Sequence, residues 1–196
     1  MTTTIKILPL LIFTIFLACN PTSRMDNPAA NSSIHHNSVS SITFVDGHYT
    51  IDTTTIVSNS NLQILIDNLE KSDLTEKKTV AEMPVFIQSF LDNLTDSFSI
   101  ANPGEDWQEG CIIGKPLPAR QLIYFGLGAE MALMTYYTGG YCTSEHILIF
   151  QFNGNEMIDF WCGNTLTDVT HKTEIIHYLK TNKDKHWGLN TNIIHL

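Results

Sequence analysis

ILIFQFNGNEMIDFW, residues 147–161, consists of two apolar runs separated by the dipeptide Asn153-Gly154. Asn-Gly is the strongest short-range signal for a β-hairpin, because both residues tolerate the positive φ that a two-residue turn requires. We therefore predict two antiparallel strands, 147–152 and 155–161, joined at this dipeptide. A two-residue turn also fixes which residues face each other across the hairpin.

In the predicted register, Leu148 faces Asp159 and His146 faces Trp161, so these four side chains share one face of the hairpin. A carboxylate, an imidazole and an indole would then lie together on a largely apolar wall, which is typical of a ligand pocket. We name His146, Asp159 and Trp161 as candidate binding residues. The ordinary alternative is a set of satisfied polar side chains near the end of a sheet.

Three segments carry the apolar spacing of amphipathic helices. Apolar residues recur at i, i+3, i+4 and i+7 from Leu62, behind Ser60 as N-cap, and again from Ile87, with Pro84 in the first turn. A third helix is predicted over 170–182. Helices with a single apolar stripe need a sheet to cover.

Other β-rich runs extend the sheet. A second turn dipeptide, Asp46-Gly47, predicts another hairpin near the start. The strands predicted outside 147–161 are 41–45, 48–57 with the β-branched run 53–57, 121–125, 132–137 and an edge strand at 192–195. The run 131–134 could instead be helical. We expect an α+β fold, with an antiparallel sheet of about four to six strands covered by two or three helices.

The first nineteen residues, MTTTIKILPLLIFTIFLAC, follow the plan of an export signal, with one cation, an apolar run and a small residue before Cys19. The apolar run is interrupted by Pro9 and is shorter than the ~20 residues that a membrane-spanning helix needs. The four residues Phe16-Leu17-Ala18-Cys19 resemble the lipobox of bacterial lipoproteins. A plain secreted protein is the main alternative.

The resemblance implies removal of 1–18, lipid on Cys19, and attachment through that lipid to the membrane of the bacterial cell envelope. Asn20 after the cysteine, where Asp often marks inner-membrane retention, favours the outer membrane. Residues 19–41 are rich in Asn, Ser and Pro and predict a flexible tether. The length of 42–196 predicts one globular domain.

The net charge of the predicted mature chain argues against nucleic acid as a partner. Loss of residues 1–18 removes only Lys6, leaving 10 Lys and Arg against 20 Asp and Glu, a net charge of about −10. Such a charge argues against nucleic acid, and suits solubility or a basic partner. In the loop 102–110, acidic residues surround Trp107, which is a further candidate for binding a sugar or a basic partner.

Motifs for cofactors and metals are absent from the sequence. There is no HExxH, no GxxxxGK[ST] and no GxGxxG, so we expect no metal and no cofactor. No catalytic residue is assigned either. The sharpest enzymatic arrangement would be Cys142 as a nucleophile with His146 as base and Asp159 orienting it, but no recognisable oxyanion arrangement accompanies them.

Three cysteines, Cys111, Cys142 and Cys162, remain beside Cys19. Three is an odd number for an oxidising compartment, so at most one disulfide can form within a chain. The sequence leaves the pair open.

Two classes of function fit these observations. We favour a tethered binding or interaction module that captures a protein or small molecule, for example an immunity-type lipoprotein that neutralises a toxin. The alternative is an envelope enzyme, or a pocketed domain similar to the NTF2-like group, whose strand-turn-strand ending the hairpin 150–161 resembles. The helix after the hairpin departs from that group's pattern.

Overall fold

The computed structural model describes residues 40–95, 97–111, 116–185 and 189. The predicted signal, the lipobox, nearly all of the predicted tether and the edge strand at 192–195 lie outside these residues. Within the described ranges, every helix is too short or too polar to span a bilayer.

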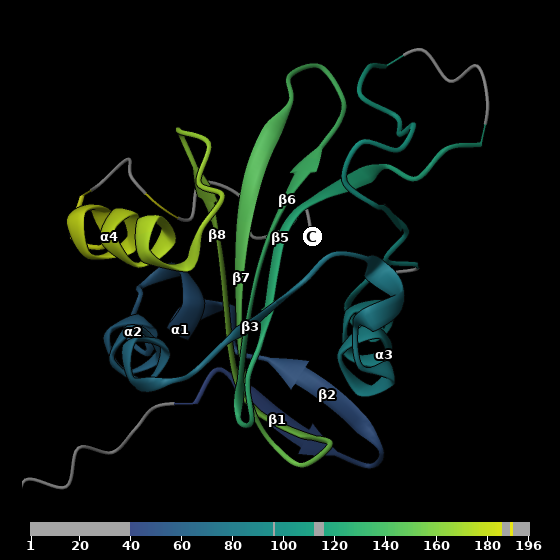
Figure 1. Ribbon diagram of the computed structural model, residues 1–196. Coiled ribbons are helices and arrows are strands. Elements are labelled where there is room, and N and C mark those ends of the chain that lie inside the picture. The colour runs from purple at the N-terminus through teal and green to yellow at the C-terminus, as the bar shows by residue number, and fades with distance from the viewer. Residues whose placement is uncertain (1–39, 96, 112–115, 186–188, 190–196) are drawn as a thin grey trace, which may run out of the picture. The chain divides into compact units, whose positions relative to one another are not determined.

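A six-stranded sheet forms the centre of the described part of the chain (Figure 1). Its strands are β3 (Thr75–Lys77), β4 (Ile100–Ala101), β5 (Arg120–Leu127), β6 (Met131–Thr138), β7 (Ser144–Asn153) and β8 (Glu156–Thr165). The order is β3-β5-β6-β7-β8 with antiparallel neighbours, and the short β4 pairs with β5 in parallel. The α+β prediction is confirmed. The helical alternative for 131–134 is wrong, since these residues lie in β6.

Helices cover both faces of this sheet. They are α1 (Thr53–Val57), α2 (Leu62–Lys71), α3 (Val85–Leu94) and α4 (Lys172–Asn182), with a short 3-10 turn at Val80–Glu82. In Figure 1, α1, α2 and α4 lie on one side of the sheet and α3 lies on the other. The predicted apolar stripe of α2 is fully buried. The helix starts differ from prediction, because α2 is capped by Asn61 rather than Ser60, and Pro84 is itself the N-cap of α3.

The first hairpin is confirmed, with β1 (Ile42–Val45) and β2 (His48–Ile51) joined at Asp46-Gly47. Its predicted continuation through 53–57 is wrong, because that run forms α1. Oδ1 of Asp52 accepts hydrogen bonds from the N–H groups of Thr54 at 3.0 Å and Thr55 at 3.3 Å. These bonds satisfy donors that the first turn of a helix leaves unpaired, and they outweigh the strand preference of the β-branched side chains.

The packed domain begins before residue 42. Ser41, which the sequence places in the tether, is fully buried, and its N–H donates to Oδ1 of Asp159 at 2.8 Å. The hydroxyl of Ser40 donates to the Ile158 carbonyl at 2.7 Å. The start of the described chain is therefore fixed to β8.

The central hairpin exists, but its predicted register is wrong. Asn153 pairs with Glu156, so the turn is Gly154-Asn155 rather than Asn153-Gly154. A β-bulge follows, in which Ile158 is an extra residue and is 43% exposed. A bulge changes the side-chain alternation of one strand relative to its partner. Beyond it, Phe150 pairs with Phe160 rather than facing Met157.

An aromatic core joins α3 to the sheet. The ring of Phe90 lies 5.2 Å from that of Phe160, 6.3 Å from that of Phe150 and 5.3 Å from that of Tyr49, all with steep interplanar angles. Edge-to-face packing of this kind is favourable beyond the area that it buries. These contacts place Phe150 and Phe160, with the even-numbered residues of β7, on the α3 side of the sheet.

Candidate functional site

The structure does not bring the three residues predicted from the hairpin together. His146 alternates with Leu148 and Phe150 along β7, so it lies on the α3 face. Its ring stacks on that of Tyr136 at 5.1 Å, and Nε2 lies 3.0 Å from the Ser144 hydroxyl oxygen. Only 4% of His146 is exposed.

Asp159 and Trp161 lie on the opposite face, under α1 and α2. Oδ1 of Asp159 accepts from the Ser41 hydroxyl at 2.9 Å and from Nδ2 of Asn61 at 2.9 Å, besides two backbone N–H groups. Nε1 of the fully buried Trp161 donates to Oδ1 of Asn59 at 3.1 Å. These two side chains hold the fold together at the start of α2. Because Asp159 and His146 face away from each other, the Cys142-His146-Asp159 arrangement does not form.

Trp107, the fourth predicted residue, leads to a different cluster. Its half-buried ring stacks on that of Tyr137, with centroids 6.2 Å apart and planes 19° apart. The Tyr137 hydroxyl in turn donates to Oδ1 of Asp168 at 3.1 Å. Tyr137 pairs with Glu145 across β6 and β7. Three functional groups that the sequence did not single out therefore meet beside Trp107.

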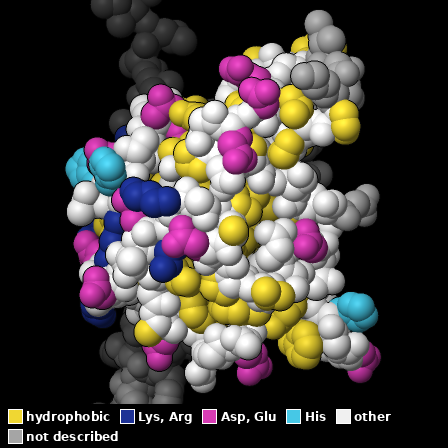
Figure 2. Space-filling view, turned by 45° about the vertical axis from the view of Figure 1, so that its right-hand side comes forward, with side chains coloured by type: hydrophobic (Ala, Val, Ile, Leu, Met, Phe, Trp, Pro, Cys, Tyr) yellow, Lys and Arg dark blue, Asp and Glu magenta, His cyan; other side chains and the backbone are white. Residues whose placement is uncertain are grey.

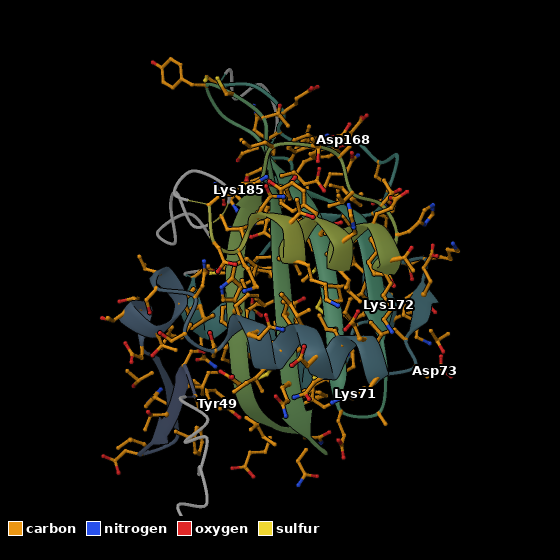
Figure 3. The ribbon with its side chains drawn as sticks, turned by 90° about the vertical axis from the view of Figure 1, so that its left-hand side faces the viewer. Tyr49, Lys71, Asp73, Asp168, Lys172 and Lys185 are labelled. Carbon is orange, nitrogen blue, oxygen red and sulfur yellow. The ribbon has the colours of Figure 1, made fainter. Side chains whose placement is uncertain are left out.

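An open pocket of about 490 Å³ is lined by Tyr137, Glu145 and Asp168, while Trp107 is not part of its lining. It lies where β7 begins and where the chain leaves β8, and Figure 3 shows Asp168 at this end of the sheet, beyond α4. The lining residues come from the end of β6, the start of β7 and the residue before it, the end of β8 and the loop before α4. The most polar are Tyr137, Ser144, Glu145, Asn164, Thr165 and Asp168.

Glu145 is the unusual member of the pocket. It is 5% exposed, and its Oε1 accepts from the Val169 N–H at 3.1 Å. Its buried Oε2 accepts no hydrogen bond of ordinary geometry among the described residues, although the Asp168 carboxyl is close enough to interact with the Glu145 carboxyl. Burial raises the pKa of Glu145 to about 7, and the Asp168 carboxyl acts in the same direction, while the Val169 N–H opposes both.

Among the residues that the structure describes, no Lys or Arg lines this pocket. The sequence holds no Lys or Arg between 121 and 171. Arg120 begins β5 with its guanidinium 4.5 Å from the ring centroid of Phe98, and Phe98 packs on Tyr136, on the α3 face. The salt bridges of the described residues involve neither Glu145 nor Asp168. In Figure 2 the Lys and Arg side chains gather on the left, and the right-hand part shows Asp and Glu side chains together with His.

A metal ion is a poor match for this pair of carboxyls. Nowhere in the described ranges do three His, Cys, Asp or Glu side chains gather in a way that could hold a metal ion. Calcium prefers six to eight oxygen ligands, more than two carboxylates supply. An organic cation with N–H donors fits the pair better.

The sequence contained a partial signal for this pocket. The stretch 121–171, which contains no Lys or Arg and includes Glu145 and Asp168 among its acidic residues, was visible in the sequence. Their meeting was not, because it depends on the pairing of β6, β7 and β8 and on the path of the loop before α4.

Comparison of the chain with protein-family models, with curated proteins and with solved structures finds no significant match.

Proposed function

We propose that this protein is a lipid-anchored lipoprotein of the bacterial envelope whose domain is a binding module, and that its pocket receives a basic side chain of a partner protein. The observation that carries the proposal is Oε2 of Glu145, which is buried in the pocket wall beside the Asp168 carboxyl and accepts no hydrogen bond of ordinary geometry among the described residues. A buried carboxylate is costly unless it is paired. A bound cation would pair it.

A Lys or Arg side chain matches the surroundings of this oxygen. A guanidinium can donate to two carboxylate oxygens at once, so it could bridge Glu145 and Asp168. Tyr137 lines the pocket and donates to Asp168, and an aromatic ring beside a carboxylate favours a cation. The exposed acidic residues of the Trp107 loop would attract a basic partner. A toxin neutralised by an immunity-type lipoprotein is one concrete form of such a partner.

The binding should depend on pH in a defined direction. Because the pKa of Glu145 is about 7, a cation competes with the proton that this carboxyl holds. Affinity is therefore expected to rise as the pH is raised from 6 to 8.

The test uses three short peptides that differ only at one central residue, which is Arg, Lys or the neutral isostere citrulline. We expect the Arg and Lys peptides to bind and the citrulline peptide to bind at least tenfold more weakly, measured by NMR titration. Glu145→Gln should abolish this preference, whereas the matched control Glu156→Gln, at the exposed turn, should keep it. Equal binding of all three peptides, or of none, would overturn the proposal.

A second candidate, an envelope enzyme, is favoured by one observation. A carboxyl with a pKa near 7 beside a second carboxyl has the properties of a general acid. With aromatic rings alongside, the pair resembles the groups used in glycoside hydrolysis. Release of nitrophenol from a panel of nitrophenyl glycosides, lost in Glu145→Gln, would distinguish the enzyme from the binding module.

A further inference from the structure

Two exposed loops lie side by side at the pocket end of the sheet (Figure 1), one at 107–111 and the other at 139–143. The N–H of Gly140 donates to the Glu109 carbonyl at 3.1 Å. Gly139 lies so close to the Gln108 carbonyl that a Cβ on this glycine would collide with the oxygen. The two loops are therefore in direct backbone contact.

These contacts align the two loops in the same direction. Gly139 lies beside Gln108 and Gly140 lies beside Glu109, so the residues in contact differ by the same number of positions. Cys142 and Cys111 each follow this contact by two residues, counted from Gly140 and from Glu109. Both cysteines are exposed. Both cysteines lie in bends outside the sheet, and a disulfide requires their Cα atoms to come within ~4.4–6.8 Å of each other.

The third cysteine does not compete for this pairing. Cys162 lies in β8, where it pairs with Leu148, and is 4% exposed. Burial raises the pKa of its thiol to about 12, which leaves very little thiolate at neutral pH.

We propose that Cys111 and Cys142 form a disulfide in the oxidising compartment. The thiolate of one cysteine attacks the disulfide of an oxidant, such as oxidised glutathione or an envelope thiol oxidase, and releases one thiol of the oxidant. The second cysteine then displaces the remaining oxidant thiol from the mixed disulfide. Two protons leave the cysteine thiols, and two electrons reduce the oxidant disulfide to two thiols.

The bond would fix one side of the pocket. The loop of Cys111 carries Trp107, which stacks on Tyr137, and the loop of Cys142 continues into Thr143 and Ser144, which line the pocket. Joining the two loops would hold the Trp107 ring next to the cluster. Oxidation and reduction would then change the binding of a ligand without altering any residue that contacts it.

The pairing is tested on the full chain carrying Cys19→Ala, so that three thiols remain. The folded protein is incubated with oxidised glutathione, alkylated, digested without reduction and analysed by mass spectrometry. We expect a peptide pair joined through Cys111 and Cys142, with Cys162 alkylated only after unfolding. The melting temperature should rise by roughly 5 to 10 °C on oxidation.

Cys111→Ser and Cys142→Ser should each remove this rise, and Cys162→Ser is the matched control that should keep it. A bond that includes Cys162, a disulfide-linked dimer, or free thiols at both loop cysteines after oxidation would overturn the proposal. This readout requires neither a membrane nor a ligand, so its failure is separate from failure of the proposed function.

Discussion

Two buried carboxylates of this domain have opposite surroundings. Oδ1 of Asp159 accepts four hydrogen bonds, which satisfy a charge in the interior. Oε2 of Glu145 accepts none within the described part of the chain. From the sequence we named Asp159, which has a structural role, as a candidate binding residue. We did not name Glu145, which lines a pocket. Residue type and apolar neighbours are similar at both positions, so only the hydrogen-bond partners separate them.

Glu145 should make the fold less stable as the pH rises. Its pKa is higher in the folded protein than the ordinary value of 4.5, so the folded chain binds more protons between pH 4.5 and about 7. The stabilising contribution is complete below pH 4.5 and is lost as the pH rises through 7. We expect a decrease on the order of 2 kcal/mol in the free energy of unfolding, from urea denaturation between pH 5 and pH 8.

Glu145→Gln is neutral throughout this range, and its unfolding free energy should lack the decrease. Glu156→Gln, at an exposed position, should retain the wild-type pH profile. Identical profiles for wild type and Glu145→Gln would show that this carboxyl is not perturbed.

At the scale of elements, the contact between the two loops depends on one glycine. A Cβ at position 139 would collide with the Gln108 carbonyl, whereas a Cβ at Gly110 would meet nothing within 4 Å. We expect Gly139→Ala to lower the free energy of unfolding by about 1 to 3 kcal/mol and to weaken the Trp107–Tyr137 stacking, measured by urea denaturation and tryptophan fluorescence. Gly110→Ala should change neither measurement, and equal effects of the two substitutions would contradict this account.

Elements with strong local signals could be predicted from the sequence. The stripe from Leu62, the Asp46-Gly47 turn and the presence of the central hairpin follow from spacing and turn chemistry, which act over a few residues. The register of the hairpin could not be predicted, because the bulge at Ile158 coincides with a contact from far along the chain. Ser40 donates to the Ile158 carbonyl, 118 residues away in the sequence. No local pattern contains such a contact.

The grouping of the candidate site residues could not be predicted from the sequence for the same reason. Tyr137 and Glu145 face each other across β6 and β7, and Asp168 joins them from the loop after β8. Predicting that group requires the correct register of two strand pairs. The predicted register of the hairpin was wrong because the bulge at Ile158 places Asp159 on the face opposite His146.

At the scale of the whole molecule, the proposed location depends on Cys19. If this residue carries lipid, several acyl chains hold the protein to the membrane, since each buried methylene contributes about 0.8 kcal/mol. We expect Cys19→Ala to move the protein from the membrane fraction to the soluble fraction, measured by ultracentrifugation and immunoblotting. Cys111→Ser is the control for loss of a thiol and should leave the distribution unchanged. Membrane association that persists in Cys19→Ala would rule out lipid attachment at this residue.

The buried junction at Ser41 has a mechanical consequence. In a protein tethered through its N-terminal segment, tension from the membrane would reach the folded domain at Ser40 and Ser41. The hydrogen bonds from Ser41 to Asp159 and from Ser40 to the Ile158 carbonyl would transmit this force to β8 before it reached β1. The small β1–β2 hairpin would then be spared from pulling, and the strength of the attachment would be set by a few hydrogen bonds around one carboxylate.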